Sequence, residues 1–193
     1  MKRKMILLLG VMVLALGLVG TPSSWANSLT FQNVTFDMSL NGAGDLALNI
    51  TNALNANGDW AGIDHLEAFA FNNYGTAAGL GNAQGWTPNE PPNGLNSGGC
   101  DGSGNFACFN GQSFALTNDF TFTITHTSGA FNLNLPNDQG GVGPSLKVLF
   151  SGADVPNGHG SLLSQPIGVP EPTSLLLLGA GLAGLGIWRR KTN

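Results

Sequence analysis

The sequence predicts an all-β fold, an antiparallel β-sandwich, for the middle of this chain. Short runs alternate apolar with polar residues, most clearly at Phe120–Thr127, where phenylalanine and isoleucine alternate with threonine. A period of two indicates a strand with one buried and one solvated face. The middle is also rich in Asn, Gly, Thr and Ser and has no long stretch of helical periodicity. Several short strands joined by Gly and Asn loops are typical of a β-sandwich.

Each predicted strand follows from one such run. The runs lie at 29–36, 46–50, 65–71, 120–127, 130–135 and 146–150. Because Ser128-Gly129 separates two alternating runs, we expect a hairpin there. The side chains expected to face the core along it are Phe120, Phe122, Ile124, Phe131, Leu133 and Leu135.

The N-terminus has the three parts of an export signal. A basic start at Met1–Lys4 precedes an apolar core from Met5 to Val19, and small residues at Ser24 and Ala26 fit cleavage by signal peptidase after Ala26. The apolar core is shorter than the ~20 residues that span a bilayer. We therefore expect a cleaved signal peptide at 1–26 instead of an uncleaved anchor.

A second apolar segment, 174–188, is followed directly by the cations Arg189, Arg190 and Lys191. Residues 175–188 reach about 21 Å as a helix, less than the ~30 Å hydrocarbon core, and Trp188 with the arginine stems would complete the span. So Gly-rich a segment before a basic cluster does not fit a buried core helix. We expect a single short transmembrane helix, with residues 27–168 exported because both basic clusters stay in the cytoplasm.

Positive charge is almost confined to the two ends. Of the seven Lys and Arg residues, only Lys147 lies between the terminal clusters, whereas ten of the eleven acidic residues, all except Glu171, lie from Asp37 to Asp154. The exported domain is therefore acidic, and no nucleic-acid partner is expected.

The tail resembles the PEP-CTERM sorting signal of Gram-negative bacteria. Its motif is Val169, Pro170, Glu171 and Pro172, followed within 169–193 by a Leu-rich and Gly/Ala-rich segment and the basic tail 189–191. The two prolines keep the motif extended. The resemblance implies recognition by exosortase, a transpeptidase-like membrane enzyme of bacteria that make extracellular polysaccharide, with removal of the tail near the motif. The middle is more loosely similar to exported domains that precede such tails.

Residues 74–111 are expected to form one long irregular loop. The two cysteines of the chain, Cys100 and Cys108, lie in it and are expected to form a disulfide, because an exported chain folds in an oxidising compartment. Such a short bridge is expected to pin the loop and not the whole fold.

Asp101, Ser103 and Asn105 occupy three ligand positions of a calcium-loop pattern. Phe106 replaces the required glycine, and Gln112 supplies no carboxylate at the twelfth position. No metal and no cofactor are therefore predicted, and these three residues are only an alternative calcium site. The acidic residues Asp59, Asp64 and Glu67 could form another cation site, but no ligand spacing distinguishes them.

No catalytic motif is present: the chain lacks a Gly-x-Ser-x-Gly elbow and a His-Glu-x-x-His helix. By its alternation with threonines, His126 is expected to be a structural histidine with satisfied hydrogen bonds, whereas His65 and His159 are expected in exposed loops.

The row Thr121, Thr123, Thr125 and Thr127 suggests a face for carbohydrate or ice, with Trp60 or Trp86 stacking on a sugar ring. Threonine is also common on the wet face of a strand, so a structural role is the stronger expectation.

The sequence therefore predicts a non-enzymatic exported protein that is anchored in the inner membrane, processed by exosortase and then located at the cell surface or outside the cell. An association with exopolysaccharide or a biofilm matrix is expected. A carbohydrate- or calcium-dependent binding module is the alternative, and a secreted hydrolase is third.

Overall fold

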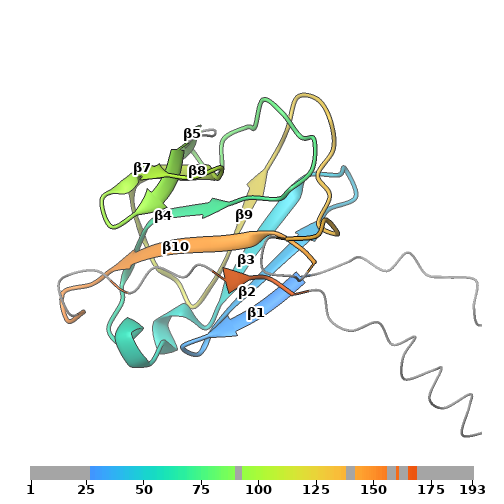
Figure 1. The fold of residues 1–193 in the computed structure, drawn as a ribbon. Helices are drawn as coiled ribbons and strands as arrows, with labels where there is room; N and C mark the ends of the chain where they lie inside the picture. Colours follow the sequence, from blue (N-terminus) through green and yellow to red (C-terminus); the bar gives the residue numbers. More distant parts are fainter. Residues whose placement is uncertain (1–26, 90–92, 138–141, 156–159, 161–164, 169–193) are drawn as a thin grey trace, which may run out of the picture.

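A computed structural model describes residues 27–168 except 90–92, 138–141, 156–159 and 161–164 (Figure 1). The predicted signal peptide with Ala26 and the sorting signal 169–193, including its motif, apolar segment and basic tail, lie outside the described residues. Within the described ranges, no helix is long and apolar enough to cross a membrane.

The first sheet contains four antiparallel strands in the order β1-β2-β3-β9. Their bounds are Asn27–Phe31 for β1, Val34–Leu40 for β2, Leu46–Thr51 for β3 and Asp119–Ile124 for β9. Gln32 and Asn33, both at positive φ, form the two-residue connection between β1 and β2, as a type I′ hairpin turn requires. Alternate residues of β2 and β3 are buried, so one face of this sheet lines the core.

The second sheet is also antiparallel and has the order β11-β10-β4-β8-β5. Its strands are β4 (His65–Phe71), β5 (Thr87–Asn89), β8 (Ala107–Ala115), β10 (Ser145–Ser151) and β11 (Gln165–Pro166). A separate hairpin consists of β6 (Asn93–Asn96) and β7 (Gly99–Ser103), and two short 3₁₀ turns, η1 (Ala53–Asn55) and η2 (Gly58–Trp60), follow β3.

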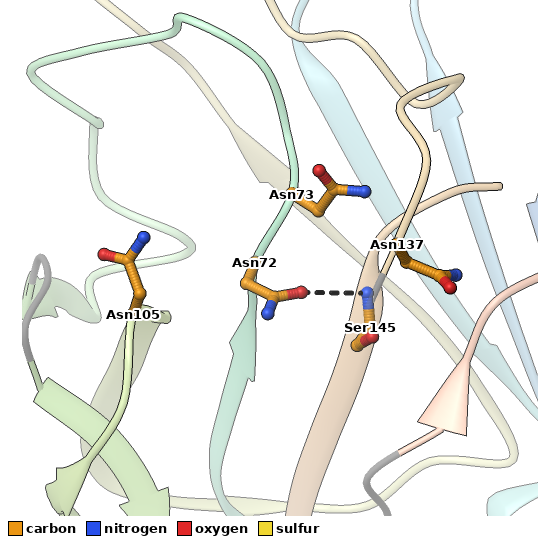
Figure 2. A pocket seen from close by; sticks show the side chains of 5 residues that line it. All are labelled: Asn72, Asn73, Asn105, Asn137 and Ser145. Carbon is orange, nitrogen blue, oxygen red and sulfur yellow. Dashed lines mark hydrogen bonds between the residues drawn. The ribbon is translucent and has the colours of Figure 1, made fainter. Parts of the chain in front are cut away.

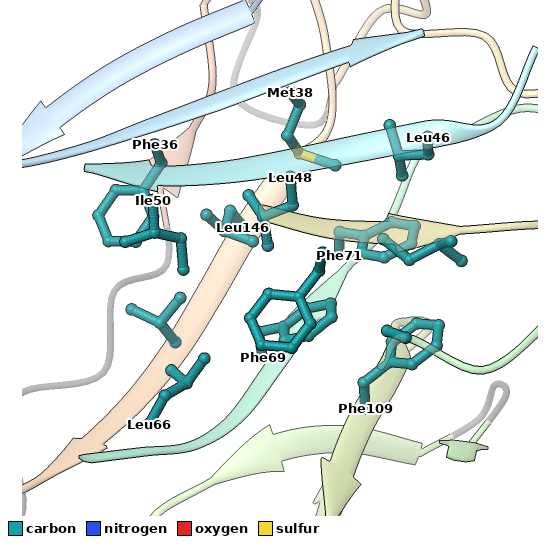
Figure 3. Packing of buried hydrophobic residues seen from close by; sticks show 14 of the residues in the cluster. Phe36, Met38, Leu46, Leu48, Ile50, Leu66, Phe69, Phe71, Phe109 and Leu146 are labelled. Carbon is teal, nitrogen blue, oxygen red and sulfur yellow. The ribbon is translucent and has the colours of Figure 1, made fainter. Parts of the chain in front are cut away.

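The two sheets face each other across one aromatic core (Figure 3). Phe69 of β4 lies near its centre, with its ring centroid 5.0 Å from those of Phe109 and Phe122 and 5.8 Å from that of Trp86. Phe36 and Leu48 approach from the first sheet. The prediction of an all-β, antiparallel fold is confirmed, and two sheets over a common core are the arrangement that a β-sandwich requires.

The predicted hairpin at 120–135 is wrong. β9 ends at Ile124 and pairs with β3, while Ser128 and Phe131 form bridges with Ala78 and Gly75 in the segment after β4. The two segments run side by side at the top of Figure 1. The burial predicted for the six apolar side chains is closer to the structure than the strand pairing predicted for them. Phe122, Ile124, Phe131 and Leu133 are buried, whereas Phe120 and Leu135 are half-buried.

The predicted irregular loop at 74–111 is also wrong, because it contains β5, β6, β7 and the start of β8. The β6–β7 hairpin packs on the outer face of the second sheet, where alanines leave room for it. The buried residues of this outer cluster are Ala68, Ala70, Leu95, Cys100, Cys108 and Leu149. The predicted disulfide is present, with an S–S distance of 2.07 Å, and it joins β7 to β8 inside this cluster. Phe106 packs against the cluster and carries the Lys147 ammonium 4.4 Å above its ring.

The two ends of the described domain meet. The Ser28 N–H donates to the Gly168 carbonyl at 3.2 Å, and the Ile167 N–H donates to the Pro144 carbonyl at 2.9 Å. Asn27, 0% exposed, donates from Nδ2 to the Leu133 carbonyl at 2.9 Å. These contacts, which we name the end clasp, hold the edge strand β1 of the first sheet against the residues that follow β11, and hold both against the segment before β10.

Replacing Gly143 with alanine is expected to break this clasp. Gly143 has φ of 113°, and an added Cβ would lie 2.5 Å from the Ile167 carbonyl oxygen and 2.7 Å from Asn27 Nδ2. We expect Gly143→Ala to lower the free energy of unfolding by at least about 1 kcal/mol, measured by denaturant titration. Gly42→Ala is the control, because nothing lies within 4 Å of its added Cβ. Equal stability of the two variants would contradict the described clasp.

Candidate functional site

A polar cavity of about 210 Å³ lies at one end of the second sheet (Figure 2). It is lined by asparagine side chains and one serine, and we name it the amide pocket. Its lining residues are Asn72, Asn73, Asn105, Asn137 and Ser145. None of these described residues is ionisable, so amide and hydroxyl groups are the polar chemistry that they give the pocket.

The strand order places these residues together. Asn72 and Asn73 directly follow β4, and Ser145 begins β10, its antiparallel neighbour, so the end of one strand lies beside the start of the other. Asn105 comes from the turn between β7 and β8, three positions before Cys108. Asn137 comes from the segment before β10 and lies on the opposite side of Ser145 from Asn105 in Figure 2.

Part of the polar lining holds the wall of the pocket. Asn72 Oδ1 accepts the Ser145 N–H at 3.2 Å. Asn73, at φ of 57°, donates from Nδ2 to the carbonyls of Leu135, Pro136 and Gly143 at 3.0, 2.9 and 3.1 Å. These bonds connect the end of β4 to the segment that leads into β10.

The remaining polar groups are available to a ligand. Ser145 is only 7% exposed, yet its hydroxyl makes no hydrogen bond with the described residues. The same holds for the Nδ2 of Asn72 and for the side chain of Asn105, which is exposed at the rim. The Ser145 hydroxyl is not one of the buried side-chain atoms of the described residues that lack a partner, which are Asn27 Oδ1 and His126 Nδ1. It lines the pocket, where a ligand or water can reach it.

A second polar group lies on the outer face of the same sheet. The Ser113 hydroxyl donates to Glu67 Oε1 at 2.8 Å, and the Ser151 hydroxyl donates to the same oxygen. His65 is held by its neighbour, with Nδ1 2.7 Å from Asp64 Oδ1. Among the described residues, neither serine hydrogen-bonds to His65. Both serine hydroxyls therefore lie on the Glu67 carboxylate, apart from the histidine that a Ser-His pair would use as its base.

The fold places the three calcium candidates in different surroundings. Asp101 and Ser103 are exposed residues of the extended strand β7, and Asn105 lines the amide pocket. In the described part of the chain, no three His, Cys, Asp or Glu side chains are grouped so that they would hold a metal ion.

Neither tryptophan is free to stack on a sugar, so that expectation is wrong. Trp60 is 0% exposed and packs edge-on against Phe31 and Phe150, and Trp86 is 5% exposed against Phe69 and Phe122. In both cases, burying the large apolar ring in the core is more favourable than exposing it to solvent.

The four threonines of the row are exposed, but two of their hydroxyls already make hydrogen bonds within the protein. Thr121 Oγ1 donates to Asn49 Oδ1 at 2.6 Å, and Thr127 Oγ1 donates to the Ala78 carbonyl at 3.1 Å. The four hydroxyls therefore do not form one free, regular row: β9 ends at Ile124, and Thr125 and Thr127 lie beyond it.

The histidines differ from expectation. His126 is half-buried with its ring centroid 4.9 Å from that of Phe131. Its buried Nδ1 has no hydrogen-bond partner among the described residues, so the expected satisfied histidine is not found there. His65 is the first residue of β4 and does not lie in a loop. His159 lies outside the described residues.

The tail provides the comparison with known proteins. A family model described as the PEP-CTERM protein-sorting motif matches residues 168–191. The chain carries a PEP-CTERM sorting motif. This motif implies an exported protein that is anchored in the membrane and processed by exosortase. The match begins at Gly168, the residue of the end clasp, so the PEP-CTERM motif starts where the described domain ends.

Searches among curated proteins and among solved structures find no match to this chain. Sequence reasoning missed the amide pocket: the only signal for it is the pair Asn72-Asn73 directly after a buried strand.

Proposed function

We propose that this PEP-CTERM protein is a non-enzymatic β-sandwich protein of the cell exterior, with a signal peptide cleaved after Ala26 and a tail removed by exosortase. Its mature domain is retained by the exopolysaccharide or biofilm matrix. The observation that carries the proposal is the sorting-motif match at 168–191, which directly continues a β-domain.

The non-enzymatic part of the proposal is supported by the polar group around Glu67. Its two serine hydroxyls both donate to the carboxylate, and His65 is engaged with Asp64. Each candidate catalytic side chain there stabilises a neighbouring strand or turn. The amide pocket favours the carbohydrate-binding alternative over a hydrolase, because amides and hydroxyls bind polar neutral ligands without activating them.

Mass spectrometry of the protein from exosortase-competent cells tests the processing. The mature chain is expected to begin at Asn27 and to end close to the motif 169–172. Cells without exosortase, and a Glu171→Gln variant in competent cells, are expected to retain the tail through Asn193. An intact C-terminus in competent cells would overturn the proposal.

A further inference from the structure

We propose that the amide pocket binds one neutral sugar unit of a polysaccharide, through the Ser145 hydroxyl and the side-chain amides of Asn72 and Asn105. This inference deepens the proposed function and takes its class of ligand, polysaccharide, from it. The evidence for a binding pocket is the geometry of the described residues.

The hydrogen-bonding groups of the pocket match those of a sugar. A sugar hydroxyl both donates and accepts, and adjacent hydroxyls present both roles side by side. Ser145 Oγ offers a donor and acceptor, Asn72 Nδ2 offers donors, and the Asn105 amide offers both. None of these groups has a partner among the described residues, so binding a sugar would require no internal hydrogen bond to break.

Charge selects a neutral ligand. The described side chains that line the pocket are neutral, so none of them is a cation that would balance a carboxylate, sulfate or phosphate on the ligand. Lys147 is the only Lys or Arg in the described part of the chain, and its ammonium lies over the Phe106 ring. Because the surrounding domain is acidic, its field repels anionic polysaccharides and leaves neutral ones unaffected.

Size and lining set the affinity. A volume of about 210 Å³ is below the roughly 300–1,000 Å³ of sites for drug-sized ligands, so the pocket suits a single unit. None of its described lining residues has an aromatic ring that would stack on the sugar. We therefore expect a dissociation constant on the order of 1 mM for one unit, and retention in a matrix by many copies of the protein on many units of the polymer.

The wall is organised before the ligand arrives. Asn73 holds three carbonyls, Asn72 holds the Ser145 backbone, and the disulfide at Cys108 fixes the turn that carries Asn105. A pocket that is already ordered loses little conformational entropy on binding, which makes weak contacts sufficient.

The test is a titration of the ¹⁵N-labelled full chain, in a detergent without a sugar head group, with methyl glucoside, methyl galactoside and the methyl glycoside of glucuronic acid. A neutral glycoside is expected to shift the side-chain amide signals of Asn72 and Asn105 and the backbone signal of Ser145. Ser145→Ala and Asn105→Ala are each expected to weaken binding about threefold to tenfold. Asn82→Ala, at an exposed asparagine outside the pocket, is the matched control and is expected to bind as the wild type does.

Three results would overturn the inference. These are the absence of shifts at the pocket with both neutral glycosides, unchanged affinity in both pocket variants, and binding of the glucuronide as tight as that of the neutral sugars. Because the assay uses the unprocessed chain, it is independent of exosortase. A failure of processing and a failure of sugar binding are therefore distinguishable.

Discussion

Replacing Phe69 with alanine is expected to lower the free energy of unfolding by about 3–5 kcal/mol, measured by denaturant titration. Phe69 is fully buried, and its ring contacts those of Phe71, Trp86, Phe109 and Phe122. These partners come from both sheets, so no single strand movement would fill the cavity. The cost therefore includes the lost contacts as well as the lost burial.

Leu54→Ala is the control for this measurement. Leu54 is 54% exposed in the turn η1, so the loss of its apolar atoms is expected to change the stability by less than about 0.5 kcal/mol. If both variants were equally stable, the two sheets would not share the described core.

Replacing Cys100 and Cys108 together with serine is expected to lower the free energy of unfolding by about 2.5 kcal/mol, the chain-entropy value for a closed loop of this length. The loss is expected to be local, because the disulfide lies in the outer cluster and not between the two sheets. Hydrogen exchange should show reduced protection of β6 and β7, with β2 and β3 retaining theirs.

The wild-type protein under reducing conditions is the control, and it is expected to reproduce the exchange pattern of the double variant. A uniform loss of protection over both sheets would show that the bridge stabilises the whole domain. An unchanged pattern would contradict the prediction, because the β6–β7 hairpin would then keep its protection without the disulfide.

Alternation located the strands well but did not identify their partners. β3 and β9 both have one buried and one solvated face, so a period of two describes each of them correctly. The turn at Ser128-Gly129 exists, with φ of 75° at Gly129, but it directs the chain against Thr76 and Ala77 instead of back along β9. Which strands pair depends on contacts across long sequence separations, and these leave no local pattern.

The amide pocket could not be predicted from the sequence for the same reason. Asn72 and Ser145 meet across a separation of 73 residues, and only the antiparallel pairing of β4 with β10 brings them together. The disulfide was predictable, because export and a single cysteine pair leave one partner for each sulfur. Ala68 and Ala70 have no unusual feature in the sequence. The β6–β7 hairpin that packs on them explains why larger side chains are absent there.

The end clasp also determines how the domain responds to tension. In the membrane-anchored precursor, a force on the tail enters the domain at Gly168, which is held by its bond to Ser28, the two-residue strand β11 and the buried side chain of Ile167. These short contacts would yield before the long ladder between β4 and β10. The released residues 165–168 would lengthen the tether by about 13 Å at ~3.3 Å per residue. The tether therefore extends first, and the sheets that carry the pocket remain folded while it does.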